Sequence, residues 1–134
     1  MNRLIMLFAC VFLFACNGRD SSYPKAEDSL DAAREFIDAF LDGDTRKASA
    51  YMVNDEENRN LLRKLHRQLE SHSEEDRQGY KESSIIIGSI ENVTEDIVII
   101  QYRSSYDREP RKVKVVRQNG TWLVDLKYTV NPNL

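Results

Sequence analysis

The spacing of apolar residues changes once along this 134-residue chain, near Tyr80, and the change limits the folds that it can adopt. Before Tyr80, apolar side chains recur every three or four residues, which is the period of an amphipathic helix. After it, they alternate with polar residues and β-branched residues predominate, as in strands. Helices followed by strands predict an α+β fold in which helices pack on an antiparallel sheet.

Two helices are expected in the first part of the chain. The first spans about residues 27–42, and Gly43 stops it. Asp44 is a favourable N-cap for a short second helix over residues 45–52. The apolar stripe of the first helix consists of Leu30, Ala33, Phe36, Ile37, Phe40 and Leu41. We expect both helices to cover one core.

A third helix is expected to start at Asn54 and Asp55 and to extend to about Ser71. Its apolar residues are Leu61, Leu62, Leu65 and Leu69. A short polar turn of helix at residues 73–78 should follow it. We expect Gly79 to end that turn, because glycine often follows the last helical residue.

Four strands are expected after the change in period, at residues 83–93, 96–106, 110–118 and 121–129. Asn119-Gly120 is typical of a type I′ hairpin turn, and the other connections are short enough to join antiparallel neighbours, so the sheet should be a meander. The third strand turns Val113 and Val115 to the core. Residues 97–100 are apolar on both faces, as in a central strand. The last strand should place on one face Trp122, Val124, Leu126 and Tyr128.

The N-terminal residues 4–15 form an unbroken apolar run after Arg3, too short to span a bilayer as a mature helix. The run ends at Cys16, and polar residues follow at once. Leu13-Phe14-Ala15-Cys16 at this boundary resembles the lipobox of bacterial lipoprotein precursors. The resemblance implies a diacylglycerol on the Cys16 sulfur and cleavage before that residue. Cleavage before Cys10 would leave too short an apolar core, and the alternative is a secretory signal with incidental cysteines.

This interpretation divides the chain into three parts. Residues 1–15 are a lipoprotein signal peptide, residues 16–25 are the lipidated Cys16 and a flexible tether, and residues 26–130 are a single domain. Acylation makes the lipid bilayer a partner, since each buried CH₂ contributes about 0.8 kcal/mol. Asn17 is not the acidic retention residue of some lipoprotein sorting systems, which favours the outer membrane and a domain that faces the periplasm of the cell envelope.

The composition excludes several chemistries from the mature domain. Both cysteines lie at or before the cleavage site, so no thiol remains as a nucleophile, disulfide partner or zinc ligand. Two histidines, His66 and His72, are too few for a metal site, and no glycine-rich phosphate loop is present. We therefore expect no metal and no cofactor. A net charge of −3 argues against nucleic acid as a partner, although basic residues gather after Asp96.

Three local sequences resemble those of bacterial envelope lipoproteins of unknown function whose domain belongs to the nuclear-transport-factor-2-like, or cystatin-like, superfamily. They are Ala33-Arg34-Glu35-Phe36 with Leu41-Asp42-Gly43-Asp44, then residues 48–52, then residues 118–124. The resemblance implies a cone formed by helices on a curved four-stranded antiparallel sheet. In that superfamily the open end of the cone often holds a small-molecule pocket, used for binding in some members and catalysis in others.

Candidate residues for the lining of such a pocket are Tyr102, Tyr106, Trp122, His66, Phe36 and Phe40. Each also has an ordinary structural interpretation, since aromatic residues at alternate strand positions are commonly core residues. No spacing brings a base and an oxyanion donor together, so we expect no catalytic residue. The sequence favours a module that binds a small ligand or an envelope protein. The alternatives are an assembly protein that uses the sheet face, such as a homodimer, and, with less support, an isomerase or cyclase in the cone.

Overall fold

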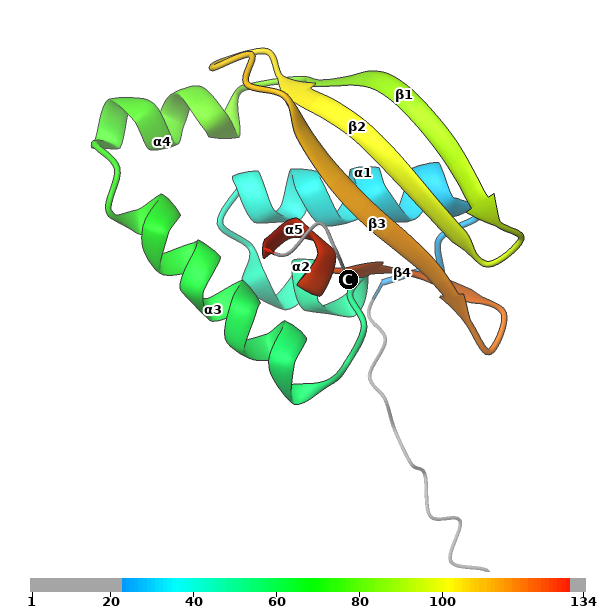
Figure 1. The fold of residues 1–134 in the computed structure, drawn as a ribbon. Helices are drawn as coiled ribbons and strands as arrows, with labels where there is room; N and C mark the ends of the chain where they lie inside the picture. Colours follow the sequence, from blue (N-terminus) through cyan, green and yellow to red (C-terminus); the bar gives the residue numbers. More distant parts are fainter. Residues whose placement is uncertain (1–22, 131–134) are drawn as a thin grey trace, which may run out of the picture.

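The computed structural model describes residues 23–130, so the predicted signal peptide, Cys16 and most of the tether lie outside the described residues (Figure 1). The elements are α1 (Ser29–Leu41), α2 (Thr45–Ala50), α3 (Glu56–Glu70), α4 (Glu74–Lys81), β1 (Ile85–Thr94), β2 (Ile97–Ser104), β3 (Arg111–Gln118), β4 (Thr121–Asp125) and α5 (Lys127–Val130). The fold is α+β with an open antiparallel sheet in the order β1-β2-β3-β4. The predicted helices followed by a meander are confirmed.

The core lies between α1 and one face of the sheet. α1 crosses the strands, and α3 and α4 form an arm that leads to the start of β1 (Figure 1). Helix α1 contributes Ala32, Ala33, Phe36, Ile37 and Ala39, and the sheet contributes Val98, Ile100, Val113, Val115 and Val124. These apolar side chains exclude water from both layers, and their burial is the main stabilising contribution to such a domain.

The predicted helix boundaries follow from local hydrogen bonds. The carboxylates of Asp28, Asp44 and Asp55 each accept a hydrogen bond from a backbone N–H of the first turn of α1, α2 and α3. Gly43 has a φ of 77°, which lies in the left-handed region that favours glycine, and α1 ends just before it. The N-cap at Asp44, the start of the third helix near Asp55 and the stop at Gly43 are confirmed, and α2 ends two residues earlier than expected.

The hairpin between β3 and β4 has the predicted turn. Asn119 and Gly120 have φ values of 50° and 75°, as a type I′ turn requires. Val113 and Val115 are buried and Lys112 is exposed, which confirms the predicted faces of β3.

The prediction that Gly79 ends the turn after α3 is wrong. Helix α4 continues through Gly79 to Lys81. A Cβ atom at this position would collide with the ring of Tyr106. Glycine is therefore needed here for a close approach between a helix and a side chain rather than as a helix stop.

The last predicted strand is also too long. Strand β4 ends at Asp125, and residues 127–130 form the short helix α5, so Tyr128 does not continue the strand face of Trp122 and Val124. The cause is Asn58, whose side chain is fully buried. Its Oδ1 accepts a hydrogen bond of 2.7 Å from the Leu126 N–H, which diverts the chain from the sheet.

The two edges of the sheet differ. The outer edge of β4 is covered by residues 51–53: the Val53 N–H donates to the Val124 carbonyl at 2.9 Å, and the Val124 N–H donates to the Tyr51 carbonyl at 2.8 Å. Within residues 23–130 no strand pairs with the outer edge of β1. This strand carries three of the four exposed large hydrophobic side chains of the described chain, Ile86, Ile90 and Val93.

The described chain begins packed against the domain. The Tyr51 hydroxyl donates a hydrogen bond of 2.9 Å to the Pro24 carbonyl, and the Tyr23 and Tyr51 rings lie 6.4 Å apart. Tyr23 and Pro24, which belong to the expected tether, are therefore packed against the domain. None of the helices in residues 23–130 is both long enough and apolar enough to cross a membrane.

We predict that Asn58→Ala lowers the free energy of unfolding by about 3 kcal/mol, because it leaves buried hydrogen-bonding groups unsatisfied. The matched control is Asn60→Ala on the exposed face of the same helix, which should change it by less than about 0.5 kcal/mol. Urea unfolding followed by Trp122 fluorescence measures both values. Equal losses in the two variants would contradict the role assigned to Asn58.

Candidate functional site

A small pocket lies where the ends of α1 and α3 meet α4 and the sheet. We call it the Tyr102 pocket. Its volume is about 190 Å³, and its lining consists of Phe40, Leu41, Leu65, Gln68, Leu69, His72, Tyr80, Tyr102, Ser104 and Arg111. Pockets for drug-sized ligands usually measure about 300–1,000 Å³. The Tyr102 pocket is therefore of a size for a small metabolite or a single side chain.

One wall of the Tyr102 pocket is apolar. Phe40 and Leu41 come from the last turn of α1, and Leu65 and Leu69 are one turn apart on α3. Leu69 is buried and the other three are half-buried. These residues belong to the stripes that pack both helices on the core, so the packing of the helices also forms this wall.

The opposite wall is polar and comes from the sheet and from α4. Tyr102 and Ser104 lie on β2, Arg111 starts β3, and Tyr80 lies in the last turn of α4. Burial raises the pKa of the Tyr102 hydroxyl, so this group is protonated at neutral pH and can donate a hydrogen bond.

Asp107 holds Tyr80 and Arg111 of the polar wall in place. Its carboxylate accepts hydrogen bonds from the Tyr80 hydroxyl at 2.9 Å, from the Arg111 guanidinium at 3.0 Å, and from the Glu109 N–H at 3.0 Å. A second Arg111 nitrogen also donates to it. Chiefly through Arg111, these contacts lower the pKa of Asp107 to about 2. Arg111 and Tyr80 are therefore held at the pocket by a carboxylate that is not itself part of the lining.

The turn that carries Asp107 is strained. The next residue, Arg108, has a φ of 59°, which lies in the left-handed region that side chains disfavour, and its N–H donates to the Ser104 carbonyl at 2.9 Å. Such strain costs roughly 1–3 kcal/mol and persists only where the surroundings impose it. Here the four hydrogen bonds to Asp107 impose it.

Tyr106 holds α4 over this end of the sheet. Its hydroxyl donates to Asp76 at 2.7 Å, which raises the pKa of Tyr106 to about 12. Its ring meets the Tyr80 ring edge-on at 5.0 Å, and the His72 ring lies 5.8 Å from the Tyr80 ring. Helix α4 buries none of its own side chains, so these contacts and the hydrogen bond from Tyr80 position it.

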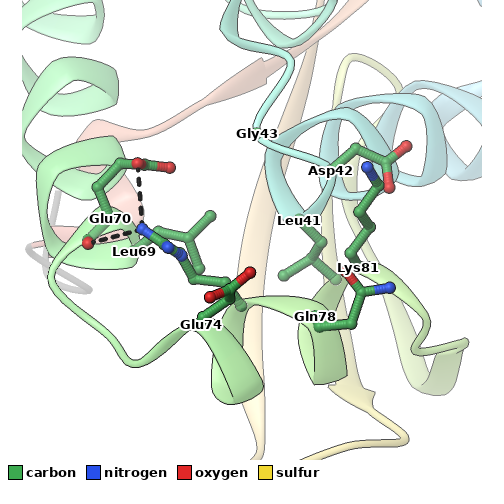
Figure 2. A pocket seen from close by; sticks show the side chains of 9 residues that line it. Leu41, Asp42, Gly43, Leu69, Glu70, Glu74, Gln78 and Lys81 are labelled. Carbon is green, nitrogen blue, oxygen red and sulfur yellow. Dashed lines mark hydrogen bonds and ion pairs between the residues drawn. The ribbon is translucent and has the colours of Figure 1, made fainter.

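A second hollow, of about 230 Å³, lies on the outer side of Leu41 and Leu69 (Figure 2). Most of its lining is charged, with carboxylates from Asp42, Glu70 and Glu74 and cations from Arg77 and Lys81. Arg77 donates to the Glu70 carbonyl at 3.2 Å and to its carboxylate at 3.4 Å. Arg77 and Glu70 form an ion pair at an exposed surface, and such pairs contribute little to stability.

The structure brings only two of the six predicted lining residues, Phe40 and Tyr102, into the Tyr102 pocket. Phe36 is buried beneath the pocket in the core, with its ring parallel to that of Phe40 at 6.4 Å. Trp122 lies at the far end of the sheet, where the Arg117 guanidinium stands 5.2 Å from its ring.

Tyr106 and His66 also lie outside the lining. β2 ends at Ser104, so Tyr106 sits in the following turn and does not share the strand face of Tyr102 as expected. His66 is half-buried on α3, and its Nδ1 has no hydrogen-bond partner among residues 23–130. Sequence reasoning missed Arg111 and Tyr80, and the one local signal for them is the spacing of four residues between Asp107 and Arg111.

No protein-family model matches the chain, and no curated protein or solved structure matches it either. Within residues 23–130, no three acidic or histidine side chains are grouped as ligands for a metal ion. The lining offers hydrogen-bond donors beside an apolar wall, and this arrangement can hold and orient a small molecule.

We predict that Asp107→Asn destabilises the protein by up to about 2 kcal/mol at pH 7, because the ion pair with Arg111 is lost. The native pKa of Asp107 is about 2 and the ordinary value is 3.8, so its contribution is complete above about pH 4. It is lost as the pH falls through the native pKa. The difference in the free energy of unfolding between wild type and variant, measured by urea unfolding, should therefore decrease from pH 4 to pH 2.

The matched control is Glu109→Gln, because the side chain of Glu109 makes no hydrogen bond to residues 23–130 and only its backbone contacts the network. The free energy of unfolding of this variant should equal that of wild type at both neutral and acidic pH. A loss for Asp107→Asn that stays constant from pH 7 to pH 2 would contradict the role of the ionised carboxylate.

Proposed function

We propose that the chain is a lipoprotein of the bacterial cell envelope, held at the membrane by acyl chains on Cys16, whose domain binds a small molecule in the Tyr102 pocket without chemical change. The apolar run that ends at Cys16 supports the anchor. On this proposal the domain is a cone of the nuclear-transport-factor-2-like superfamily. The order of helices before an antiparallel meander, with a pocket at one end of the sheet, supports it.

The observation that carries the binding function is the division of the Tyr102 pocket into two walls. Leucine and phenylalanine side chains would shield an apolar body from water, and Tyr102 and Arg111 would orient a polar group. Asp107 holds Arg111 in place before any ligand arrives, and such pre-organisation lowers the entropic cost of binding.

The anchor predicts a specific labelling result. Cells that express the chain and are fed an alkyne analogue of palmitate should label the wild-type protein, which should sediment with membranes. Cys16→Ser should lose the label and Cys10→Ser should keep it, because only Cys16 stands at the boundary between apolar and polar residues. Labelling that survives Cys16→Ser would refute the assignment.

Binding predicts a retained molecule. Native mass spectrometry of the full chain, released from detergent micelles without denaturation, should show an added small mass. Leu65→Trp should remove this mass, because the indole fills the pocket. Leu61→Trp is the matched control one turn earlier on α3 and outside the lining, so it should retain the mass. An unchanged adduct in Leu65→Trp would exclude the Tyr102 pocket as its site.

A second candidate function is assembly through the sheet, favoured by the open outer edge of β1 with Ile86, Ile90 and Val93 exposed. The same spectra discriminate between the two functions. A dimer with an empty pocket, which Ile90→Lys converts to a monomer, would favour assembly. A monomer that retains its ligand would favour binding.

A further inference from the structure

We infer that the Tyr102 pocket takes a small monocarboxylate with a short apolar tail. The carboxylate would lie against Arg111 and the Tyr102 hydroxyl, and the tail would lie among Phe40, Leu65 and Leu69. This inference rests on the proposed function, since it names the class of molecule that the same pocket binds.

The first argument is that the polar wall has unused hydrogen-bond donors. A guanidinium has five N–H groups. Arg111 donates two to Asp107 and one to the Glu109 carbonyl, at 3.2 Å, so its Nε–H and one Nη2–H have no partner among residues 23–130. The hydroxyl of Tyr102 likewise makes no hydrogen bond within the described chain. A carboxylate is the common ligand group that accepts from an Arg fork and a hydroxyl together.

The second argument is the sign of the charge. Arg111 is the one arginine or lysine of the lining, and no Asp or Glu lines the Tyr102 pocket. The neighbouring hollow differs, because Asp42, Glu70 and Glu74 line it. Asp107 balances the charge of Arg111, but its oxygens already accept four hydrogen bonds. A cationic ligand would therefore find no free acceptor carboxylate, whereas an anion would find free donors.

The third argument is size. A volume of about 190 Å³ lies below the range of about 300–1,000 Å³ found for pockets that bind drug-sized ligands. This volume fits a carboxylate and roughly four or five carbon atoms. Hexanoate is accordingly a suitable probe. It would place its tail against the leucines of α3 and its charge at the start of β3.

The test measures binding of hexanoate to the full chain in phosphatidylcholine nanodiscs by isothermal titration calorimetry, with the heat of empty nanodiscs subtracted. We expect hexanoate to bind, and hexanamide, which has the same shape and no charge, to bind at least tenfold more weakly. Tyr102→Phe keeps the ring and removes one donor, so it should weaken hexanoate binding about tenfold. The matched control, Tyr23→Phe, alters a tyrosine that packs on Tyr51 outside the pocket and should leave the affinity unchanged.

Equal affinities for hexanoate and hexanamide, or an affinity that Tyr102→Phe does not change, would overturn the inference. The failure of this inference is distinguishable from that of the proposed function. If hexanoate does not bind but native spectra show another molecule that Leu65→Trp displaces, the carboxylate is wrong and binding in this pocket stands. If neither hexanoate nor a displaceable molecule is found, both are wrong.

Discussion

The carboxamide of Asn58 lies fully buried between the start of α3 and the end of β4. Its nitrogen donates to Asp55 at 3.1 Å and to Asp125 at 3.3 Å, while its oxygen accepts from the Leu126 N–H. The Asp55 carboxylate also accepts from the Asn58 backbone N–H at 2.7 Å and from Lys127 at 2.8 Å, and chiefly these two hydrogen bonds lower the pKa of Asp55 to about 2. The Asn58 side chain thus holds the capping carboxylate of α3, ends a strand and satisfies buried groups that would otherwise be costly. The helical and sheet halves of the fold share this connection.

The position of the Tyr102 pocket depends on that connection. With its first turn fixed at β4, α3 runs away from the sheet and presents Leu65 and Leu69 toward the end of α1. Helix α4 then connects the end of α3 to the start of β1 (Figure 1). Because α4 buries no side chain, hydrogen bonds worth about 0.5–1.5 kcal/mol each hold much of it, and displacing it costs less than displacing α3. The apolar wall is therefore harder to displace than the helix that contributes Tyr80 to the polar wall.

Local patterns predicted most of the elements because the interactions that form them are local. Period, N-cap and hairpin turn each depend on residues within a few positions, and the helices, the meander and the turn at Asn119 were predicted correctly. Two of the errors, the length of the last strand and the role of Gly79, arose from contacts between distant residues. Leu126 is buried and in phase with Val124, so the strand pattern continues past the point where Asn58, 68 residues away, ends the strand. Gly79 is at a typical helix stop in sequence, and only the ring of Tyr106 reveals its actual role.

The difference between local patterns and contacts that no pattern shows also explains which part of the pocket was predictable. Phe40 and Tyr102 belong to a helix stripe and a strand face, so periodicity placed them correctly. No sequence period marks the residues of the polar wall, because the turn between β2 and β3 positions them. In this turn Arg108 adopts a left-handed conformation and Asp107 orients Arg111. The two walls therefore depend on different interactions. The core packing that stabilises the domain fixes the apolar wall, whereas the polar wall depends on a short turn. Substitutions in that turn can change which polar group is recognised while the fold is retained.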